Sequence, residues 1–357
     1  MSMYRWLLLF LTLPCLSKSY GQLPKVEKVV DSIIVRENFN GVVLIAKNGK
    51  QEYIKYAGLS DRKNSIKFSE NSRFKIFSVT KTFTAALIMK LYEDGRLNLD
   101  STISKYYPEY TGEGRDKITI RNLLSYSSGR DCKEMKVIAE AYNTTIWPVD
   151  TFINKYCSEK LISRPGEKFD YNNGDYIILG RIIEKIYGKS FQEVLNEQIL
   201  IPLKMHNTNY LHHEDIIESI DEGYFNKDLS ITKFYTPTNY YIDNYFSAGA
   251  MYSNANDLLI FDNAIFKHRI LKKATVDLML TGNPNLGDVA FGFWVYEKKI
   301  GNINTIFAER QGYGYGHNSN WVHLVDKGIT LILLSNTNTV NLNKMREKVL
   351  EAYLSHN

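Results

Sequence analysis

The sequence predicts an α+β fold in which an antiparallel sheet, flanked by helices, is joined to a mostly helical lobe. Strand patterns lie near both ends of the chain, each next to one amphipathic helix pattern, and helical patterns fill the middle. The 357 residues are 44% hydrophobic and 23% charged, which supplies enough apolar residues to bury a core. This composition excludes a disordered, collagen-like or coiled-coil chain.

The first elements after the N-terminal segment are a helix and a hairpin. Apolar residues recur every three or four positions over residues 24–37, which predicts an amphipathic helix. Residues 41–46 are apolar and rich in β-branched side chains, and residues 51–56 alternate in polarity. Asn48-Gly49 lies between them, and this dipeptide is typical of a tight hairpin turn.

The C-terminal part mirrors this arrangement, with strands followed by one closing helix over residues 341–355. We expect the strands near 41–57 and 292–335 to form one antiparallel sheet beside the two terminal helices. The predicted C-terminal strands are residues 292–296, 321–325 and 329–334.

The middle of the chain is mainly helical. Residues 78–93 are apolar almost all round, and Gly95 is placed to end this helix. A helix that is apolar on every side belongs in the centre of the protein. Two further helices are predicted over residues 176–187 and 191–200, separated by Gly188.

Residues 1–21 have the order of a secretory signal peptide. Arg5 precedes an apolar run over residues 6–13, and small residues precede a cleavage site after Gly21. The run is shorter than the ~18 residues that a spanning helix needs, so no membrane span is expected after cleavage. A lipoprotein signal that uses Cys15 is the alternative. We expect an exported protein, either periplasmic or secreted.

Charge and cysteine content narrow the function classes. The net charge is +5, and residues 1–21 hold two basic and no acidic residues, so a processed chain carries +3. Such a small excess does not favour binding to nucleic acid. After cleavage Cys132 and Cys157 remain, either as a disulfide or as two buried thiols.

The first chemical motif is Ser78-Val79-Thr80-Lys81, in which a serine and a lysine share one helix face. Ser78 would lie at the helix start, beside free backbone N–H groups and the positive end of the helix dipole. Burial disfavours an ammonium group, and a neutral amine can take the serine proton. A capping serine with a surface lysine is the alternative, but the apolar helix around Lys81 favours catalysis.

The second motif is Tyr171 with Asn173, in a loop that follows Pro165-Gly166 and precedes a predicted helix. Two residues apart in an extended loop, both side chains point the same way. A tyrosine can transfer a proton, and an asparagine amide can bind a substrate carbonyl and orient a lysine. Loop packing with helix capping is the alternative.

The third motif is the glycine-containing segment 314–320, directly before the predicted strand at 321–325. Its candidate site residues are His317, Ser319 and Asn320. Glycines beside a strand allow close approach by a ligand. A hairpin turn rich in glycine and tyrosine is the alternative.

Together the motifs resemble those of the penicillin-recognising serine hydrolases, which include class C β-lactamases, low-molecular-mass penicillin-binding proteins, D-aminopeptidases and related esterases. The serine–two–lysine motif is a signature of this group, and Tyr171-Asn172-Asn173 is similar to its Tyr-x-Asn motif. Further similar segments follow in the family's order: residues 74–85, 91–100, 118–129 and 247–258.

The resemblance covers nearly the whole chain after residue 21. It implies a single catalytic domain of the β-lactamase/transpeptidase-like type over residues 22–357. The sheet lobe would comprise about residues 22–77 and 245–357, and the helical lobe about residues 78–244.

The third motif departs from the family pattern, which reads Lys-Thr-Gly, His-Thr-Gly or His-Ser-Gly. It is matched here to His317-Asn318-Ser319, so a serine stands where the family has glycine. Ser319 would add a side chain to one wall of the substrate cleft. We expect it to obstruct a bicyclic β-lactam more than a slender ester or a D-amino-acid peptide.

The resemblance also implies a role for each site residue. Ser78 attacks the acyl carbon, and Lys81 and Tyr171 transfer its proton and later that of the leaving group or water. Asn173 holds Lys81 and the substrate amide. His317 orients Tyr171 or the far end of the substrate.

The oxyanion hole implied by the resemblance consists of the backbone N–H groups of Ser78 and Asn320. No metal or other cofactor is implied. The predicted function is an exported serine hydrolase that acts through an acyl-enzyme on a small-molecule or peptide acyl substrate.

That substrate is an ester, a D-amino-acid peptide or a β-lactam amide. The His-led third motif resembles the esterase-like members, so an esterase or D-peptidase is expected rather than a dedicated β-lactamase. The alternative is a non-catalytic binding or sensor protein on the same fold, because the wall at Ser319 is altered.

Overall fold

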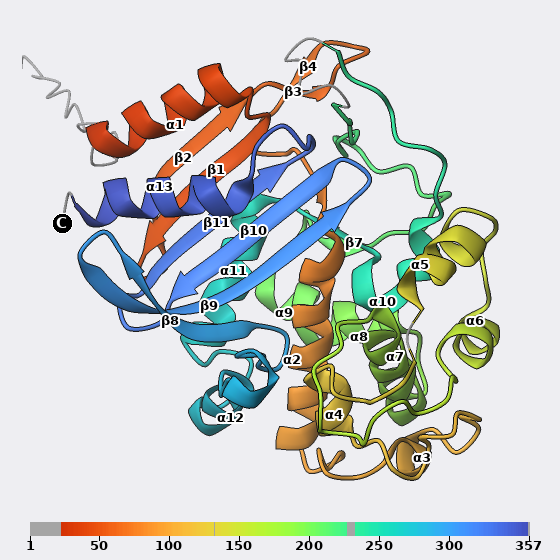
Figure 1. Ribbon diagram of the computed structural model, residues 1–357. Coiled ribbons are helices and arrows are strands. Elements are labelled where there is room, and N and C mark those ends of the chain that lie inside the picture. Colours follow the sequence, from red (N-terminus) through yellow and green to blue (C-terminus); the bar gives the residue numbers. More distant parts are fainter. Residues whose placement is uncertain (1–22, 132, 227–232, 356–357) are drawn as a thin grey trace, which may run out of the picture.

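The structure of the protein, a computed structural model, describes residues 23–131, 133–226 and 233–355 (Figure 1). The predicted signal peptide over residues 1–21 lies outside the described residues and stays a prediction. Cys132 also lies outside them, so both states considered for the cysteine pair remain open. Cys157 is buried.

One six-stranded sheet, antiparallel throughout, joins the two ends of the chain. β1 pairs with β11 over its whole length, from Gly41 opposite Ser335 to Lys47 opposite Ile329. This confirms the predicted single sheet. In spatial order the strands are β2 Lys50–Ala57, β1 Gly41–Lys47, β11 Ile329–Ser335, β10 His317–Leu324, β9 Ile303–Gly314 and β8 Trp294–Ile300.

The hairpin between β1 and β2 turns at Asn48 and Gly49, as predicted. Both residues have positive φ, 49° and 74°. Positive φ at both central residues defines the turn whose twist matches that of the flanking strands, and asparagine and glycine adopt it with least strain.

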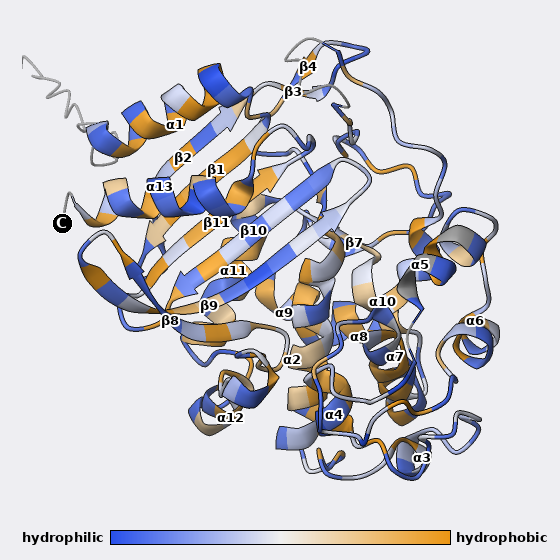
Figure 2. Ribbon diagram, in the orientation of Figure 1, coloured by the Kyte–Doolittle hydropathy of each residue, from blue (hydrophilic) through white to orange (hydrophobic). Residues whose placement is uncertain are grey.

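The two terminal helices, α1 Pro24–Glu37 and α13 Leu342–Leu354, lie side by side on one face of the sheet (Figure 1). Both show orange and blue stripes when coloured by hydropathy (Figure 2). Their apolar stripes meet the sheet in one buried cluster, which includes Val26, Val30, Val43, Leu331 and Val349.

The opposite face of the sheet is covered by the helical part of the chain. At its centre lies α2 Thr80–Glu93, with eleven of fourteen residues buried, which places this helix in the interior as predicted. A 3-10 turn, η1 Phe77–Val79, precedes it. Two neighbours of α2 are α7 Asn173–Tyr187 and α10 Phe246–Gly249.

The remaining elements are short or lie around this centre. The other helices are α3 Ile103–Tyr106, α4 Ile120–Leu124, α5 Glu134–Val137, α6 Val149–Tyr156, α8 Phe191–Leu195, α9 Ile201–Leu203, α11 Ala255–Phe266 and α12 Lys273–Met279. The other strands are β3 Leu59–Asp61, β4 Ile66–Lys67, β5 Phe74–Lys75, β6 Asn209–Tyr210 and β7 Met251–Ser253.

Three strands of the six-stranded sheet differ from the prediction. β9 was not predicted, β10 begins at His317 rather than at residue 321, and β8 covers Trp294–Ile300 rather than residues 292–296. Hydropathy colouring shows the reason, because much of β9 and β10 is polar whereas β1 and β11 are mostly hydrophobic (Figure 2). Because these residues are polar, the two strands lack the apolar runs from which strands were predicted.

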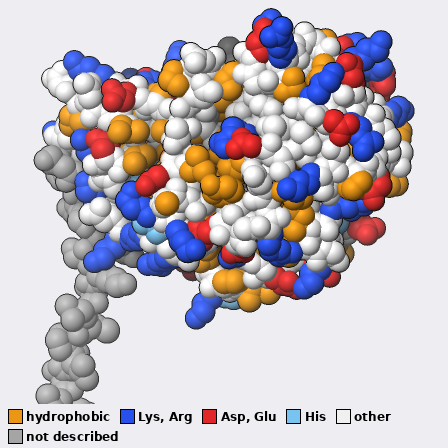
Figure 3. Space-filling model, turned by 90° about the horizontal axis from the view of Figure 1, so that it is seen from below, with side chains coloured by type: hydrophobic (Ala, Val, Ile, Leu, Met, Phe, Trp, Pro, Cys, Tyr) orange, Lys and Arg blue, Asp and Glu red, His pale blue; other side chains and the backbone are white. Residues whose placement is uncertain are grey.

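The surface seen from below carries acidic and basic side chains interspersed, with hydrophobic side chains in small groups (Figure 3). This face has no patch of a single charge sign of the kind that binds nucleic acid. Among the described residues, no helix is both long enough and apolar enough to cross a membrane.

A buried ion pair joins the segment after α4 to the start of α7. Arg130 Nη2 lies 2.7 Å from Asp175 Oδ1 and 2.9 Å from Asn172 Oδ1. The side chains of Arg130 and Asp175 have no exposed surface. A buried charge without its partner is strongly unfavourable, so this contact ties the loop that carries residues 171–173 to the helical core.

We expect Arg130→Ala to lower the free energy of unfolding by about 3–5 kcal/mol, because it leaves the Asp175 carboxylate buried without its cation. Urea denaturation followed by circular dichroism measures this. The control is Arg121→Ala, which removes the partner of Asp100 in an exposed pair and should cost less than about 1 kcal/mol. Equal losses in the two variants would contradict this assignment.

Candidate active site

Ser78 lies in the 3-10 turn that leads into α2. The residue before it, Phe77, has a φ of 42°, a conformation that is strained for a bulky side chain. Aromatic rings hold Phe77 in place: those of Tyr240, Tyr245, Tyr315 and His317 lie 5.6–6.3 Å from it between centroids. This packing sets the position from which Ser78 points into the cleft.

Lys81 lies one turn further along and is completely buried. Its Nζ atom is 3.0 Å from Ser78 Oγ, 2.7 Å from Asn173 Oδ1 and 2.8 Å from the carbonyl oxygen of Ala248. Three acceptors match the three N–H donors of an ammonium group. The geometry therefore suits a positively charged Lys81 that donates to Ser78.

Tyr171 approaches Ser78 from the other side, with 2.7 Å between its hydroxyl oxygen and Ser78 Oγ. Tyr171 is 37% exposed, while its hydroxyl contacts Ser78 and Arg310. Burial of the hydroxyl acts to raise its pKa, but the charges of Lys81 and Arg310 and hydrogen bonds from Lys81 and Ser78 outweigh this and lower the pKa of Tyr171 to about 8.

Asn173 begins α7, where the preceding Asn172 caps the helix by accepting from the Asp175 N–H group. The side chain of Asn173 is oriented at both ends. Its oxygen accepts from Lys81, and its Nδ2 donates to Tyr142 Oη at 3.2 Å. In this structure Asn173 holds Lys81, as predicted.

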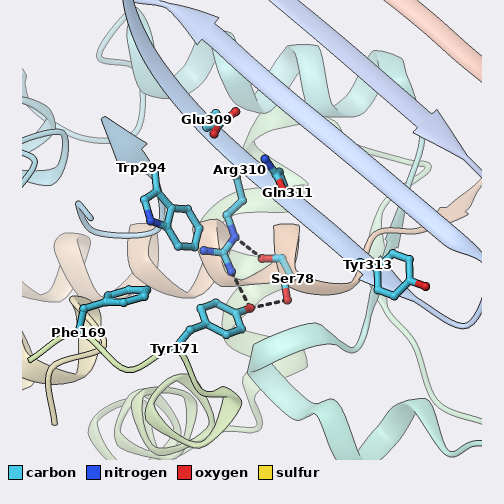
Figure 4. A pocket seen from close by; sticks show the side chains of 8 residues that line it. All are labelled: Ser78, Phe169, Tyr171, Trp294, Glu309, Arg310, Gln311 and Tyr313. Carbon is cyan, nitrogen blue, oxygen red and sulfur yellow. Dashed lines mark hydrogen bonds between the residues drawn. The ribbon is translucent and has the colours of Figure 1, made fainter. Parts of the chain in front are cut away.

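Arg310 is a site residue that the sequence analysis missed. It extends from β9 between the Trp294 ring and Ser78 (Figure 4). Its Nε donates to the carbonyl oxygen of Ser78 at 2.7 Å and its Nη2 to Tyr171 Oη at 3.2 Å. Its Nη1 donates to Tyr126 Oη at 2.9 Å. A second cation thus lies against the serine and the tyrosine.

The predicted place of His317 in the cleft is wrong. The side chain is 1% exposed, and its Nε2 lies 2.9 Å from Asp221 Oδ1. It contacts the Phe77 ring instead of Tyr171 and does not line the Ser78 cavity. His317 begins β10 at a hairpin, one strand behind the edge that faces Ser78, so it supports the turn that carries Ser78 from behind.

Ser319 and Asn320 are also displaced from the cleft. Both belong to β10, an interior strand, opposite Gly312 and Gln311 of β9 respectively. They border a separate hollow of about 510 Å³. The Asn320 backbone lies in the ladder with β11, so it is not an oxyanion donor, and Ser319 is not the predicted obstacle to β-lactams.

The segment that takes the place of the third motif is Arg310-Gln311-Gly312. It has the same order of cation, polar residue and glycine, and it lies on the strand beside Ser78. Gly312 is required by close approach, because a Cβ at this position would lie 2.1 Å from the carbonyl oxygen of Ile76. The strand edge and the serine turn are therefore in direct contact.

The open edge of β9 also offers a backbone donor. The hairpin between β9 and β10 has a two-residue turn, so Gly314 and His317, which flank it, form a hydrogen-bonded pair. Along an antiparallel ladder, hydrogen-bonded pairs alternate with pairs whose backbone groups point away from the partner strand. Gln311 and Tyr313 therefore direct their backbone groups away from β10, where the pairing with β8 has already ended at Glu309. The Tyr313 N–H group replaces that of Asn320 as the second candidate oxyanion donor.

A cavity of about 550 Å³ opens in front of Ser78, with aromatic side chains forming much of its wall (Figure 4). No group of three or more histidine, cysteine, aspartate or glutamate side chains in the described part of the chain is placed to hold a metal ion. The residues that line the cavity are Ser78, Phe169, Tyr171, Trp294, Glu309, Arg310, Gln311 and Tyr313.

Two curated proteins of Staphylococcus aureus are similar in sequence to this chain. The protein Flp of Staphylococcus aureus strain N315 is 31% identical over 193 residues, which are 52% of this chain and 38% of Flp. The teichoic acid D-alanine hydrolase of S. aureus is 27% identical over 239 residues, 66% of this chain and 56% of the relative. The chain thus spans two fifths to just over half of the length of these relatives.

A solved structure, that of D-amino acid amidase from Ochrobactrum anthropi SV3 complexed with D-phenylalanine, superposes with a TM-score of 0.81 at 22% identity. The superposition covers 93% of this chain and 99% of the amidase, so the fold is the same. The family model described as Beta-lactamase matches residues 26–354. This chain, with its serine, lysine and tyrosine in mutual contact, therefore belongs to the Beta-lactamase family.

Proposed function

We propose that this protein is an exported serine hydrolase that transfers the acyl group of an ester or a D-amino-acid peptide to Ser78 and then to water. The observation that carries the proposal is the position of Ser78 Oγ between Lys81 Nζ at 3.0 Å and Tyr171 Oη at 2.7 Å. Export is inferred from the sequence of residues 1–21 alone.

The contacts give Lys81 and Tyr171 different roles, rather than two bases that share the serine proton. Lys81 donates to Ser78 Oγ, which leaves the serine proton to be donated to Tyr171. A pKa of about 8 makes the Tyr171 phenolate accessible near neutral pH. Tyr171 then acts as the general base, and Lys81 and Arg310 stabilise its negative charge.

The tetrahedral intermediate requires donors for its oxyanion. Ser78 is the second residue of a 3-10 turn, and the first backbone N–H groups of a helical turn have no acceptor within it. Its N–H group and that of Tyr313, across the cavity mouth, form the proposed oxyanion hole. The protonated Tyr171 next donates to the leaving group, and in deacylation it removes a proton from the attacking water.

Relatives support the choice of substrate class. One is named for the hydrolysis of D-alanine from teichoic acid, and one of known structure is a D-amino acid amidase. Both names describe the transfer of an acyl group from oxygen or nitrogen, which is the reaction that a serine nucleophile with an adjacent base performs.

Replacement of the nucleophile tests the proposal. Ser78→Ala should abolish the hydrolysis of p-nitrophenyl acetate, because it removes the covalent acceptor, while near-UV circular dichroism stays unchanged. Release of p-nitrophenolate measures the rate. Undiminished turnover in this variant would exclude Ser78 as the nucleophile, and a folded wild type without any turnover would favour a binding or sensor protein.

The pH profile reports the state of Tyr171. Its base form exists above its pKa, so kcat/KM should fall about tenfold per pH unit below pH 8 and level off above it. Arg310→Gln removes one of the cations that lower this pKa, so the acidic limb should move to higher pH. Arg310→Lys, which keeps the charge, is the control. A limb that stays in place in Arg310→Gln would contradict the role of Arg310.

Two substitutions, one at Gly312 and one at Ser319, test whether Arg310-Gln311-Gly312 takes the place of the third motif. Gly312→Ala inserts a Cβ against Ile76 and should lower kcat/KM about 100-fold, since a displacement of ~1 Å at the site has effects of that size. Ser319→Gly, at the matched position one strand behind, should change it less than about threefold. The reverse order of effects in p-nitrophenyl ester assays would restore His317-Asn318-Ser319 as the third motif.

A further inference from the structure

We propose that the acyl pocket discriminates against acyl groups that carry a carboxylate. This inference rests on the proposed function and names its substrate class more closely. Among the residues that line the cavity, Arg310 is the only cation, and its side chain has no exposed surface.

The guanidinium of Arg310 is enclosed on every side that the structure describes. It has no exposed surface, and its central carbon lies 5.0 Å from the Trp294 ring centroid. The rings of Tyr126 and Tyr171 lie 5.9 Å and 5.8 Å away. Figure 4 shows the guanidinium between Trp294 and Ser78, directed at Ser78 and Tyr171.

The Arg310 guanidinium donates to acceptors within the protein: the Ser78 carbonyl oxygen and the hydroxyls of Tyr126 and Tyr171. A substrate carboxylate that entered the cavity would lose water without meeting a guanidinium fork in return. An anion transferred to such a site without a paired donor is strongly disfavoured.

The other charged residue of the cavity is an acid. Glu309 is 7% exposed and forms an ion pair with Arg346, and its Oε1 accepts from Tyr296 Oη at 2.9 Å. Arg346 is itself 3% exposed, so it is committed to this pair. A substrate carboxylate would therefore approach a negative group and no accessible positive one.

The rest of the wall suits an apolar acyl group. Phe169, Tyr171, Trp294 and Tyr313 line the cavity, and three of them present large accessible surfaces, Phe169 and Tyr171 at 37% each and Tyr313 at 62%. Aromatic walls gain free energy from contact with aliphatic and aromatic groups and offer nothing specific to a carboxylate.

The test uses two esters that differ in charge but hardly in shape, p-nitrophenyl 4-methylphenylacetate and p-nitrophenyl 4-carboxyphenylacetate. We expect kcat/KM for the carboxylate ester to be about 30-fold lower, after correction for spontaneous hydrolysis. Equal values for the two esters would overturn the inference and leave the proposed function standing. A neutral ester whose turnover does not depend on Ser78 would overturn the proposed function, and the inference with it.

A pair of cavity variants tests the cause. Trp294→Ala uncovers the guanidinium, so the preference for the neutral ester should fall at least about fivefold. Phe169→Ala also enlarges the cavity but leaves Arg310 covered, so it should keep the preference. If both variants change the preference equally, or if Trp294→Ala leaves it unchanged, cover by Trp294 is not the cause and the inference is overturned.

Discussion

The amine of Lys81 is the group on which the arrangement of the site depends. A fully buried ammonium group is tolerated only with its donors satisfied, and the acceptors come from three separate parts of the chain. Ser78 precedes α2, Asn173 begins α7, and Ala248 belongs to α10. The Lys81 amine therefore joins these three elements. Its partners Asn173 and Ala248 lie 92 and 167 positions from Lys81 in the sequence.

Arg310 performs the corresponding task between the helices and the sheet. It donates to the backbone of the serine turn and to two tyrosines, so β9, the start of α2 and the loop before α7 meet at one guanidinium. Both cations lie close to Tyr171, and their charges outweigh the burial of its hydroxyl and lower the pKa of Tyr171 to about 8. We infer that the same burial keeps Arg310 from contact with a substrate, so that the residue proposed to activate the base would also limit what the pocket binds.

Patterns among neighbouring residues in the sequence predicted much of the fold and part of the site. Periodicity predicted α1, the β1–β2 hairpin and the buried α2, and helix geometry placed Lys81 on the face of Ser78. Periodicity failed at β9, because Glu309, Arg310 and Gln311 interrupt any apolar pattern there. The third motif was consequently matched to the glycines next to His317, although Gly312 follows a cation in the same order. Only the pairing of β9 with β10 shows which strand lies at the edge, and pairing is a non-local property.

The central claim is that Ser78 forms the acyl-enzyme. Intact-protein mass spectrometry after incubation with a fluorophosphonate, followed by peptide mapping, tests it most directly, because the phosphonyl group remains on the attacking oxygen. We expect one adduct per chain, located on Ser78, that forms more slowly in Tyr171→Phe because the base is lost. A folded protein that acquires no adduct, or that acquires it at another residue, would exclude Ser78 as the nucleophile.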